Sequence, residues 1–292
     1  MNVVGALVAR NLRLFFRDRL NVFFSLLGAI ILFALYTLFL SNLQTSGLQE
    51  TFPSADPDDI KAFVDSWMFA GIVVITTITT GLGALSVLVD DSQSGRFRDF
   101  LVSPIRRSQI VLGYLISAVT VALIMSMVVL VVSILYLGIV DQVWLAPDAV
   151  VRAVGILVLC CTAFTALSAF VVSFVRTAGA FSALSTIAGT ILGFIAGAYI
   201  PIGALPVAVG NVINALPFGQ AAMLFRREFT SETLPAMSGG VSAAEEAIRQ
   251  AYGIDAIVGD WTVPAAIAVG ILIVLAIVCT VLSAFRIRTR IR

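Results

Sequence analysis

The side chains that most often carry chemistry are scarce in this chain. None of its 292 residues is histidine, which removes the commonest general base, the commonest metal ligand and the usual proton switch near neutral pH. Metalloprotease and Ser–His chemistry are excluded with it. The single lysine, Lys61, follows Asp-Pro-Asp-Asp-Ile, a stretch without the glycines of a Walker A loop. We expect this chain to hold no ATP site, no metal and no cofactor.

The three cysteines also give no catalytic pattern. Cys160, Cys161 and Cys279 all fall in apolar stretches, and no CxxC pair occurs. Buried thiols of this kind are typically small, packed and reduced. Neither paired carboxylates nor a nucleophile–base pair lies within an apolar stretch, so an intramembrane enzyme is disfavoured.

One polar segment between two apolar stretches has the features of a docking element. Residues 90–109 are DDSQSGRFRDFLVSPIRRSQ, in which Phe97 and Leu101 share a helix face and Pro104 ends the helix. A short helix with aromatic knobs and a charged rim suits a groove on another protein. A solvated basic loop is the alternative. The candidate docking residues are Gly95, Arg96, Phe97, Arg98, Asp99, Phe100, Leu101, Ser103, Pro104, Arg106 and Arg107.

Residues 5–19 are predicted to form an amphipathic interfacial helix. Arg10, Arg13 and Arg17 share one face at 100° per residue, opposite a face that includes Phe16. Such a helix lies in the membrane interface with its arginines toward anionic headgroups. It is either a generic anchor or part of the contact with a cytoplasmic partner.

A long uncharged run with three prolines follows Arg176. No charged residue occurs before Arg226, so the run is too long for one crossing of a hydrocarbon core about 30 Å thick. It must cross once and double back, which predicts a re-entrant hairpin over 201–225 that leads to arginines at the surface. Irregular backbone at membrane depth is tolerated where it lines a cavity. The candidate pathway residues are Pro201, Pro206, Asn211, Asn214, Pro217 and Phe218.

Composition sets the fold class. The chain is 60% hydrophobic and 12% charged, whereas soluble domains are about 25% charged. We predict an all-α integral membrane protein with one transmembrane domain, in which the spans as drawn contain no ionisable side chain. The six predicted spans are 21–40, 67–89, 110–140, 153–175, 177–200 and 261–285.

The distribution of basic residues predicts the orientation. Six spans place both termini on one side, and thirteen of the eighteen basic residues fall on that side. By the positive-inside rule this side is cytoplasmic. The acidic outer segment, 226–260, contains the capping-box pattern Ser242-Ala-Ala-Glu245, which predicts a short helix that Gly253 ends.

A ridge of small residues is expected on the fifth span. Four of them recur every fourth residue, which permits close approach of another helix in the same subunit or across a dimer. These residues are Ser185, Gly189, Gly193 and Gly197.

Two of these motifs, in this order, resemble the ABC-2-type exporter permeases, the membrane subunits of bacterial drug, lipid and polysaccharide efflux systems. Gly95–Arg107 followed by Ile110-Val-Leu-Gly113 is similar to the coupling-helix region of that family, although Asp90 and Asp91 stand where glutamates are common. The segment from Ile200 to Arg226 resembles its re-entrant signature. The resemblance covers essentially the whole chain.

The resemblance implies a dimer of permeases, or a heterodimer with a sibling, in the bacterial inner membrane. Two separate ATPase subunits would carry ATP and Mg²⁺ and seat on the loop with Phe97 and Arg98. Hydrophobic drugs or antibiotics are the expected cargo, then lipids, then lipid-linked polysaccharides. A sodium-coupled secondary transporter is the remaining rival, because proton relay needs a titratable group near the midplane.

Overall fold

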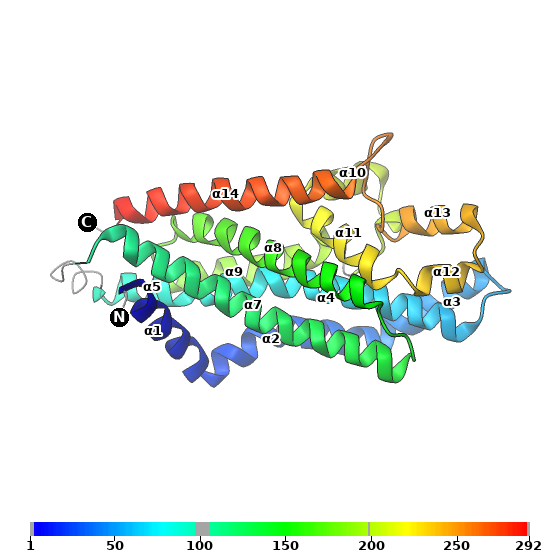
Figure 1. The fold of residues 1–292 in the computed structure, drawn as a ribbon, viewed down its shortest axis with the longest axis horizontal. Helices are drawn as coiled ribbons and strands as arrows, with labels where there is room; N and C mark the ends of the chain where they lie inside the picture. Colours follow the sequence, from blue (N-terminus) through cyan, green and yellow to red (C-terminus); the bar gives the residue numbers. More distant parts are fainter. Residues whose placement is uncertain (1–2, 97–104, 198, 291–292) are drawn as a thin grey trace.

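The computed structural model describes residues 3–96, 105–197 and 199–290. In the described residues the helices run lengthwise in an elongated bundle whose two termini lie at one end (Figure 1). We call this end, with α1 and α5, the termini end; the opposite end, with α3 and α13, is the far end. The elements of the first half are α1 (Val3–Arg17), α2 (Arg19–Leu35), a π-helical turn η1 (Tyr36–Leu40), α3 (Ser41–Thr51), α4 (Pro57–Ala84), α5 (Ser86–Gln93) and α7 (Arg107–Val140).

The second half adds three long helices, a broken segment and, at the far end, a small unit of residues 233–262 that we call the far-end cap. In the described part of the chain the only strands are two of two residues each, which pair antiparallel with Ile257 opposite Thr262 and Val258 opposite Trp261. The elements are α8 (Pro147–Val172), α9 (Ala178–Ile195), a 3-10 turn η2 (Ile202–Ala204), α10 (Val207–Ala215), α11 (Pro217–Phe229), α12 (Thr233–Ser238), α13 (Ser242–Ala251), β1 (Ile257–Val258), β2 (Trp261–Thr262) and α14 (Ala265–Arg290).

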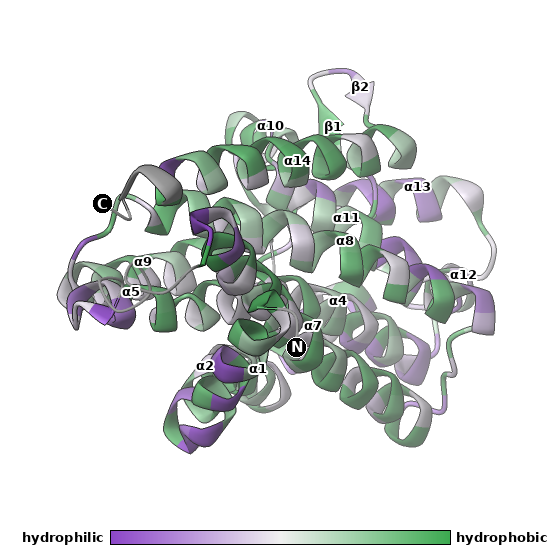
Figure 2. Cartoon of the chain, turned by 60° about the vertical axis from the view of Figure 1, so that its left-hand side comes forward, coloured by the Kyte–Doolittle hydropathy of each residue, from purple (hydrophilic) through white to green (hydrophobic). Residues whose placement is uncertain are grey.

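Six helical segments are long and apolar enough to cross a membrane, which confirms the all-α integral membrane fold. Hydrophobic residues cover most of these helices, while hydrophilic residues gather on α12, α13 and the region of α5 at the two ends (Figure 2). Among the described residues the candidate spans are Arg19–Thr51, Pro57–Gln93, Arg107–Val140, Pro147–Val172, Ala178–Ile195 and Ala265–Ile287.

Helix α4 is the core of the bundle. It packs against α2, α7, α8 and α11, and its side chains are buried on nearly every face, from Ile60 through Trp67 to Leu82. A helix that is apolar all round lies either in a protein core or against lipid, and the neighbours of α4 enclose it as a core helix. A displacement of α4 would therefore alter its contacts with most of the other long helices.

Local sequence signals explain where the first helices begin. Asp18 breaks α1 from α2, because its Oδ1 accepts the backbone N–H groups of Leu20 and Asn21, both at 3.1 Å, as an N-cap. Asp56 caps α4 in the same way by accepting the N–H of Asp58, and Pro57 occupies the first helical turn. The Asp18 cap sets the boundary between α1 and α2, and the Asp56 cap sets the start of α4.

Several helix limits differ from the sequence expectation. Helix α4 begins at Pro57 instead of residue 67, since the Asp-Pro cap starts the helix before the apolar stretch does. Helix α14 begins at Ala265, because Trp261 belongs to strand β2. The α10–α11 pair bends by 86° at its break, so the uncharged run after α9 does not continue as one straight helix; its re-entrant path in a membrane stays a prediction.

Candidate functional site

One buried carboxylate joins three segments at the termini end. Asp91 in α5 has no exposed surface and accepts hydrogen bonds from Arg10 of α1, from Arg96 and from the Tyr114 hydroxyl of α7. Arg10 binds both carboxylate oxygens, at 2.6 and 2.9 Å, and Arg96 Nη1 lies 3.0 Å from Oδ1. Bidentate charged pairs are the strongest side-chain hydrogen bonds, so this arrangement ties α1 and α5 to α7. We call these four residues the Asp91 cluster.

The two arginines compensate for the unfavourable position of the Asp91 carboxylate in α5. Asp91 lies in the last turn of α5, where the backbone carbonyls carry partial negative charge and disfavour a carboxylate. The guanidinium groups of Arg10 and Arg96 offset that charge. In turn, the hydrogen bond with Asp91 raises the pKa of Arg10 above its usual value, so Arg10 stays charged.

Helix α1 also packs directly on α7. Leu7 fits over Gly113, where an added Cβ would come 2.8 Å from the Leu7 Cβ. One turn further on, Asn11 Nδ2 donates to Ser117 Oγ at 3.2 Å in a buried contact. The glycine of the Ile110–Gly113 motif is therefore the contact point that lets the two helices approach.

These contacts correct the sequence interpretation of α1. The helix forms, but it covers residues 3–17, and Arg10 turns toward Asp91 instead of toward headgroups. Arg13 and Arg17 are exposed, and Phe16 is partly exposed and meets the ring of Phe15 edge-on. The sequence reasoning missed Asp91 as a partner because it placed that residue in a loop. The sequence did contain a signal for this pairing: Asp91 and the arginines of residues 5–19 fall on the same predicted side of the membrane.

The predicted docking segment is only partly described. Gly95 has a φ of +76°, which reverses the chain after α5, and Arg96 belongs to the Asp91 cluster. At the start of α7 the Arg106 backbone N–H donates to Gln109 Oε1 at 3.0 Å, and the side chains of Arg106 and Arg107 are exposed. The remaining predicted residues lie outside the described part of the chain: Phe97, Arg98, Asp99, Phe100, Leu101, Ser103 and Pro104.

At the far end the structure overturns one expectation. Arg226 was expected at the surface, but it is completely buried in α11. Its Nη2 donates to the carbonyls of Ala196 and Gly197 at 3.0 and 2.7 Å, and Nη1 donates to Gly253 at 3.4 Å. Its Cζ lies 5.1 Å from the centroid of the Trp67 ring, a cation–π contact.

Arg226 thus caps the end of α9 from a different helix. The carbonyls of Ala196 and Gly197 belong to the C-terminus of α9, where unsatisfied carbonyls favour a cation. Gly197 and Gly253 both have positive φ, and an added Cβ would come 3.0 and 2.7 Å from the guanidinium. Only glycine permits this close approach of two chain reversals to one arginine.

Residues of the predicted re-entrant hairpin, 201–225, contact the far-end cap. Asn211 Oδ1 accepts the Gly259 N–H at 3.2 Å, and Asn214 Nδ2 donates to the Ile257 carbonyl at 2.9 Å, so both bind the β1–β2 hairpin. Phe218 stacks on Phe164 of α8, with ring centroids 5.2 Å apart. The prolines begin elements: Pro201 precedes η2, Pro206 precedes α10 and Pro217 opens α11.

A second network of charged side chains lies at the far-end cap. Asp255 accepts Arg249 Nε at 2.7 Å and also binds Arg227. Burial alone raises the pKa of Asp255, but the hydrogen bonds from Arg249 and Arg227 outweigh it and hold that pKa below its usual value. Helix α13 begins at Ser242 as predicted but without a side-chain cap; Glu245 instead accepts from Ser238 Oγ.

The small-residue ridge is not one continuous face. Ser185 and Gly189 line a cavity of about 400 Å³ between α2, α4 and α9. A Cβ at Gly193 would overlap the ring of Tyr199, so Gly193 serves packing within the chain. Gly197 lies beyond the end of α9 with a φ of +63°, because it is the left-handed residue that ends the helix.

Ionisable groups do occur on the long helices, although not where the predicted spans were drawn. Lys61 and Asp65 lie in the early turns of α4, and the Lys61 ammonium group donates to both Asp65 and Asp141. The cysteines are unpaired and buried. Within the described ranges no group of three or more His, Cys, Asp or Glu side chains is arranged to hold a metal ion.

The fold and these motifs agree with a comparison to protein families. A search of curated proteins gives no match to this chain. The family model described as ABC-2 type transporter matches residues 2–227, which include the Asp91 cluster, the docking segment, the hairpin and Arg226. The match covers more than half of the chain, and it ends before the far-end cap and α14. The chain therefore belongs to the ABC-2 type transporter family.

Proposed function

We propose that this chain is the permease subunit of an ATP-driven exporter in a bacterial inner membrane. Two permease chains, either two copies or this chain and a sibling, bind two ATPase subunits. The ATPases carry ATP and Mg²⁺, because this chain lacks a Walker A loop. The cargo is hydrophobic or amphipathic, a drug, an antibiotic or a lipid-like molecule.

The observation that carries the proposal is the Asp91 cluster. The docking segment begins in the last turn of α5, which contains Asp91, and it ends in the first turn of α7, the helix that contains Tyr114. Both ends of the segment are thus tied to one carboxylate, together with α1. A push on the segment by an ATPase is transmitted to α5 and α7, and from both to the core helix α4, which α5 follows and on which α7 packs. That is an allosteric coupling between sites on different chains.

The basic charge of the termini end supports a cytoplasmic location for this cluster. Arg13, Arg17, Arg106 and Arg107 all expose their side chains there. Positively charged loops face the cytoplasm, where the ATPases lie. In this orientation Phe97 and Arg98 lie in the segment that the ATPase groove receives.

The poorly covered helices support contact with a second permease chain. Helices α2 and α9 each bury only two residues, Ala29 and Leu32 in α2 and Leu192 and Gly193 in α9. The cavity between them opens beside Gly189, where nothing within the chain would meet an added Cβ. Cargo moves along these apolar faces when the two bundles rock.

Purification in mild detergent tests the proposal. We expect a separate ATPase polypeptide to remain bound, and reconstituted vesicles to export a hydrophobic dye only when ATP is supplied. Recovery of the lone chain, with transport in ATP-free vesicles under a sodium gradient, would contradict the proposal and favour a secondary transporter.

A further inference from the structure

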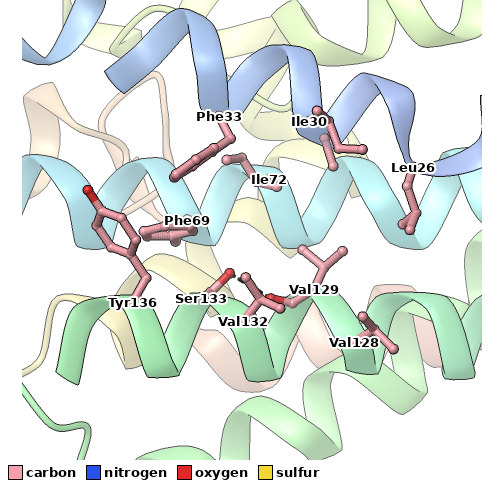
Figure 3. A pocket seen from close by; sticks show the side chains of 11 residues that line it. Leu26, Ile30, Phe33, Phe69, Ile72, Val128, Val129, Val132, Ser133 and Tyr136 are labelled. Atoms are coloured by element: carbon pink, nitrogen blue, oxygen red, sulfur yellow. Dashed lines mark hydrogen bonds between the residues drawn. The ribbon is translucent and has the colours of Figure 1, made fainter. Parts of the chain in front are cut away.

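An apolar cavity lies between α2, α4 and α7, away from the α2–α9 side. It has a volume of about 220 Å³, and Figure 3 shows Phe33, Phe69 and Tyr136 at one end of it and Leu26 and Val128 at the other. From Val128 to Tyr136 the cavity follows α7 for about 12 Å at 1.5 Å per residue. Its shape suits an extended alkyl chain.

The cavity faces the lipid-exposed side of the bundle. Ile30, Val128 and Val132 line it and are about half exposed, at 46%, 49% and 56%. A molecule in the membrane therefore reaches it sideways, without passing through the bundle.

A polar cavity continues the apolar one toward the far end. It has a volume of about 490 Å³, and Tyr136 lines both cavities, so the two are adjacent at this side chain; we refer to them together as the groove. The polar half lies where α2 gives way to the polar helix α3 and where α4 begins. Its lining residues are Thr37, Ser41, Asn42, Thr45, Ser46, Gln49, Pro57, Asp58, Lys61, Asp65 and Tyr136.

The charge of the polar half is negative. Lys61 Nζ donates to Asp65 Oδ2 at 2.7 Å and also binds Asp141, so one ammonium group serves two carboxylates. The second oxygen of Asp141 is buried and has no hydrogen-bond partner. Asp58, exposed on the rim, adds a further negative charge. Lys61 is thus occupied, and an incoming anion meets a surplus of carboxylates.

We propose that this groove binds an amphiphile with one alkyl chain and a cationic head. The chain lies against Phe33, Phe69 and Val132, and the head lies beside Asp58. Lipid tails are as apolar as the cavity, so chain burial alone gives little preference inside a membrane. The head therefore sets the specificity, and a cation is attracted to uncompensated carboxylates at short range. The groove contains none of the residues that we propose to couple to the ATPase. Its ligand binding can therefore be tested with this chain in the absence of ATPase subunits.

Native mass spectrometry on the chain in phosphatidylcholine nanodiscs tests the inference. Dodecyltrimethylammonium is the probe and dodecyl sulfate is its anionic counterpart. We expect one ammonium amphiphile to stay bound per chain, at least tenfold more tightly than the sulfate. Val132→Trp fills the apolar half and Asp58→Asn removes the rim charge, and each is expected to weaken binding at least tenfold.

Neighbouring residues outside the groove give matched controls. Val131→Trp places the same bulk on an adjacent exposed position, and Asp59→Asn makes the same charge change one residue away; neither residue lines the groove. Both are expected to bind the probe within twofold of the unaltered chain. Size-exclusion profiles of all four variants check that they fold.

The lipids that co-purify with the chain identify the source of the ligand. Enrichment of a lipid with one alkyl chain and an amine head identifies a membrane lipid as the source, and its absence together with probe binding identifies a free cationic amphiphile. Equal binding of the sulfate would overturn the inference. So would undiminished binding by Val132→Trp, or a change in that variant's oligomeric state alone, which would assign the groove to a second copy.

Discussion

The two ends of the bundle bury a charge in different ways. At the termini end the Asp91 carboxylate is neutralised by side chains from separate segments, Arg10 and Arg96. At the far end Arg226 instead donates hydrogen bonds to backbone carbonyls, at the end of α9 and at Gly253. The first arrangement links elements through side chains that can part and re-form. The second is built into the backbone of two chain reversals and resists change.

The difference suits the roles that we propose for the two ends. A cluster of side chains next to the docking segment transmits a displacement, because each pair can shift without breaking a helix. Arg226, held by backbone carbonyls, joins the C-terminal ends of α9 and α11 to the far-end cap as one unit. Four measurements, in order of decreasing expected effect, test this contrast.

The largest effect is expected for Arg226→Met. The variant keeps an unbranched apolar stem but leaves at least two buried carbonyls without a donor, at a cost of about 3 kcal/mol or more in the free energy of unfolding. Unfolding in dodecyl sulfate, followed by tryptophan fluorescence, measures it. Arg227→Met is the control, because that side chain is partly exposed and its ion pair contributes about 1 kcal/mol or less. Equal losses in both variants would contradict the special role of Arg226.

A smaller loss is expected for Asp91→Asn, about 2–3 kcal/mol, because hydrogen bonds to charged groups contribute about 1.5–3 kcal/mol and the amide keeps only part of them. The same unfolding assay measures it. Asp90→Asn makes the matched change at an exposed neighbour and is expected to shift stability by less than about 0.5 kcal/mol. If Asp91→Asn is as stable as the control, the cluster does not hold the three segments together.

Gly113→Ala tests how closely α1 must lie on α7. The added Cβ meets Leu7 at 2.8 Å, so we expect a loss of about 1–2 kcal/mol and faster amide exchange in α1. Leu7→Gly in the same chain removes the Cβ that clashes and is expected to restore slow exchange, a coupling that a double-mutant cycle detects. No rescue would show that α1 is held by the charges alone.

The smallest effect concerns pH at the far-end cap. The folded pKa of Asp255 is lowered, so its contribution is present above the unfolded value of about 3.9 and is lost as pH falls through the folded pKa. Amide exchange of 249–255 is expected to accelerate below about pH 4. Asp255→Asn is expected to exchange fast at every pH, with no such step. An acid-induced step that persists in this variant would assign it to another group.

The sequence predicted the fold class well because hydropathy and span length are local properties. Six spans, the amphipathic start and the break in the run after α9 follow from runs of apolar residues and from prolines. The start of α4 was missed although Asp56-Pro57 is a strong helix-start signal, since the span was drawn from hydropathy alone.

The two buried charges depend on the tertiary fold and lay beyond sequence reasoning. Asp91 and Arg10 are eighty-one positions apart, and nothing local pairs them. Arg226 has backbone partners, which leave no mark in a pattern of charged residues. Gly197 was assigned to a helix face by its spacing, whereas its position after the last turn of α9 makes it the residue that ends the helix.

The most direct test of the account is retention of the ATPase by a variant of the docking segment. We expect Phe97→Ala combined with Arg98→Glu to retain less than a tenth of the ATPase in a pull-down, while all six spans stay inserted in the membrane. Reversal of an arginine at the far end, Arg152→Glu, is expected to leave retention unchanged. Undiminished ATPase binding by the double variant would contradict the docking role and the coupling built on it.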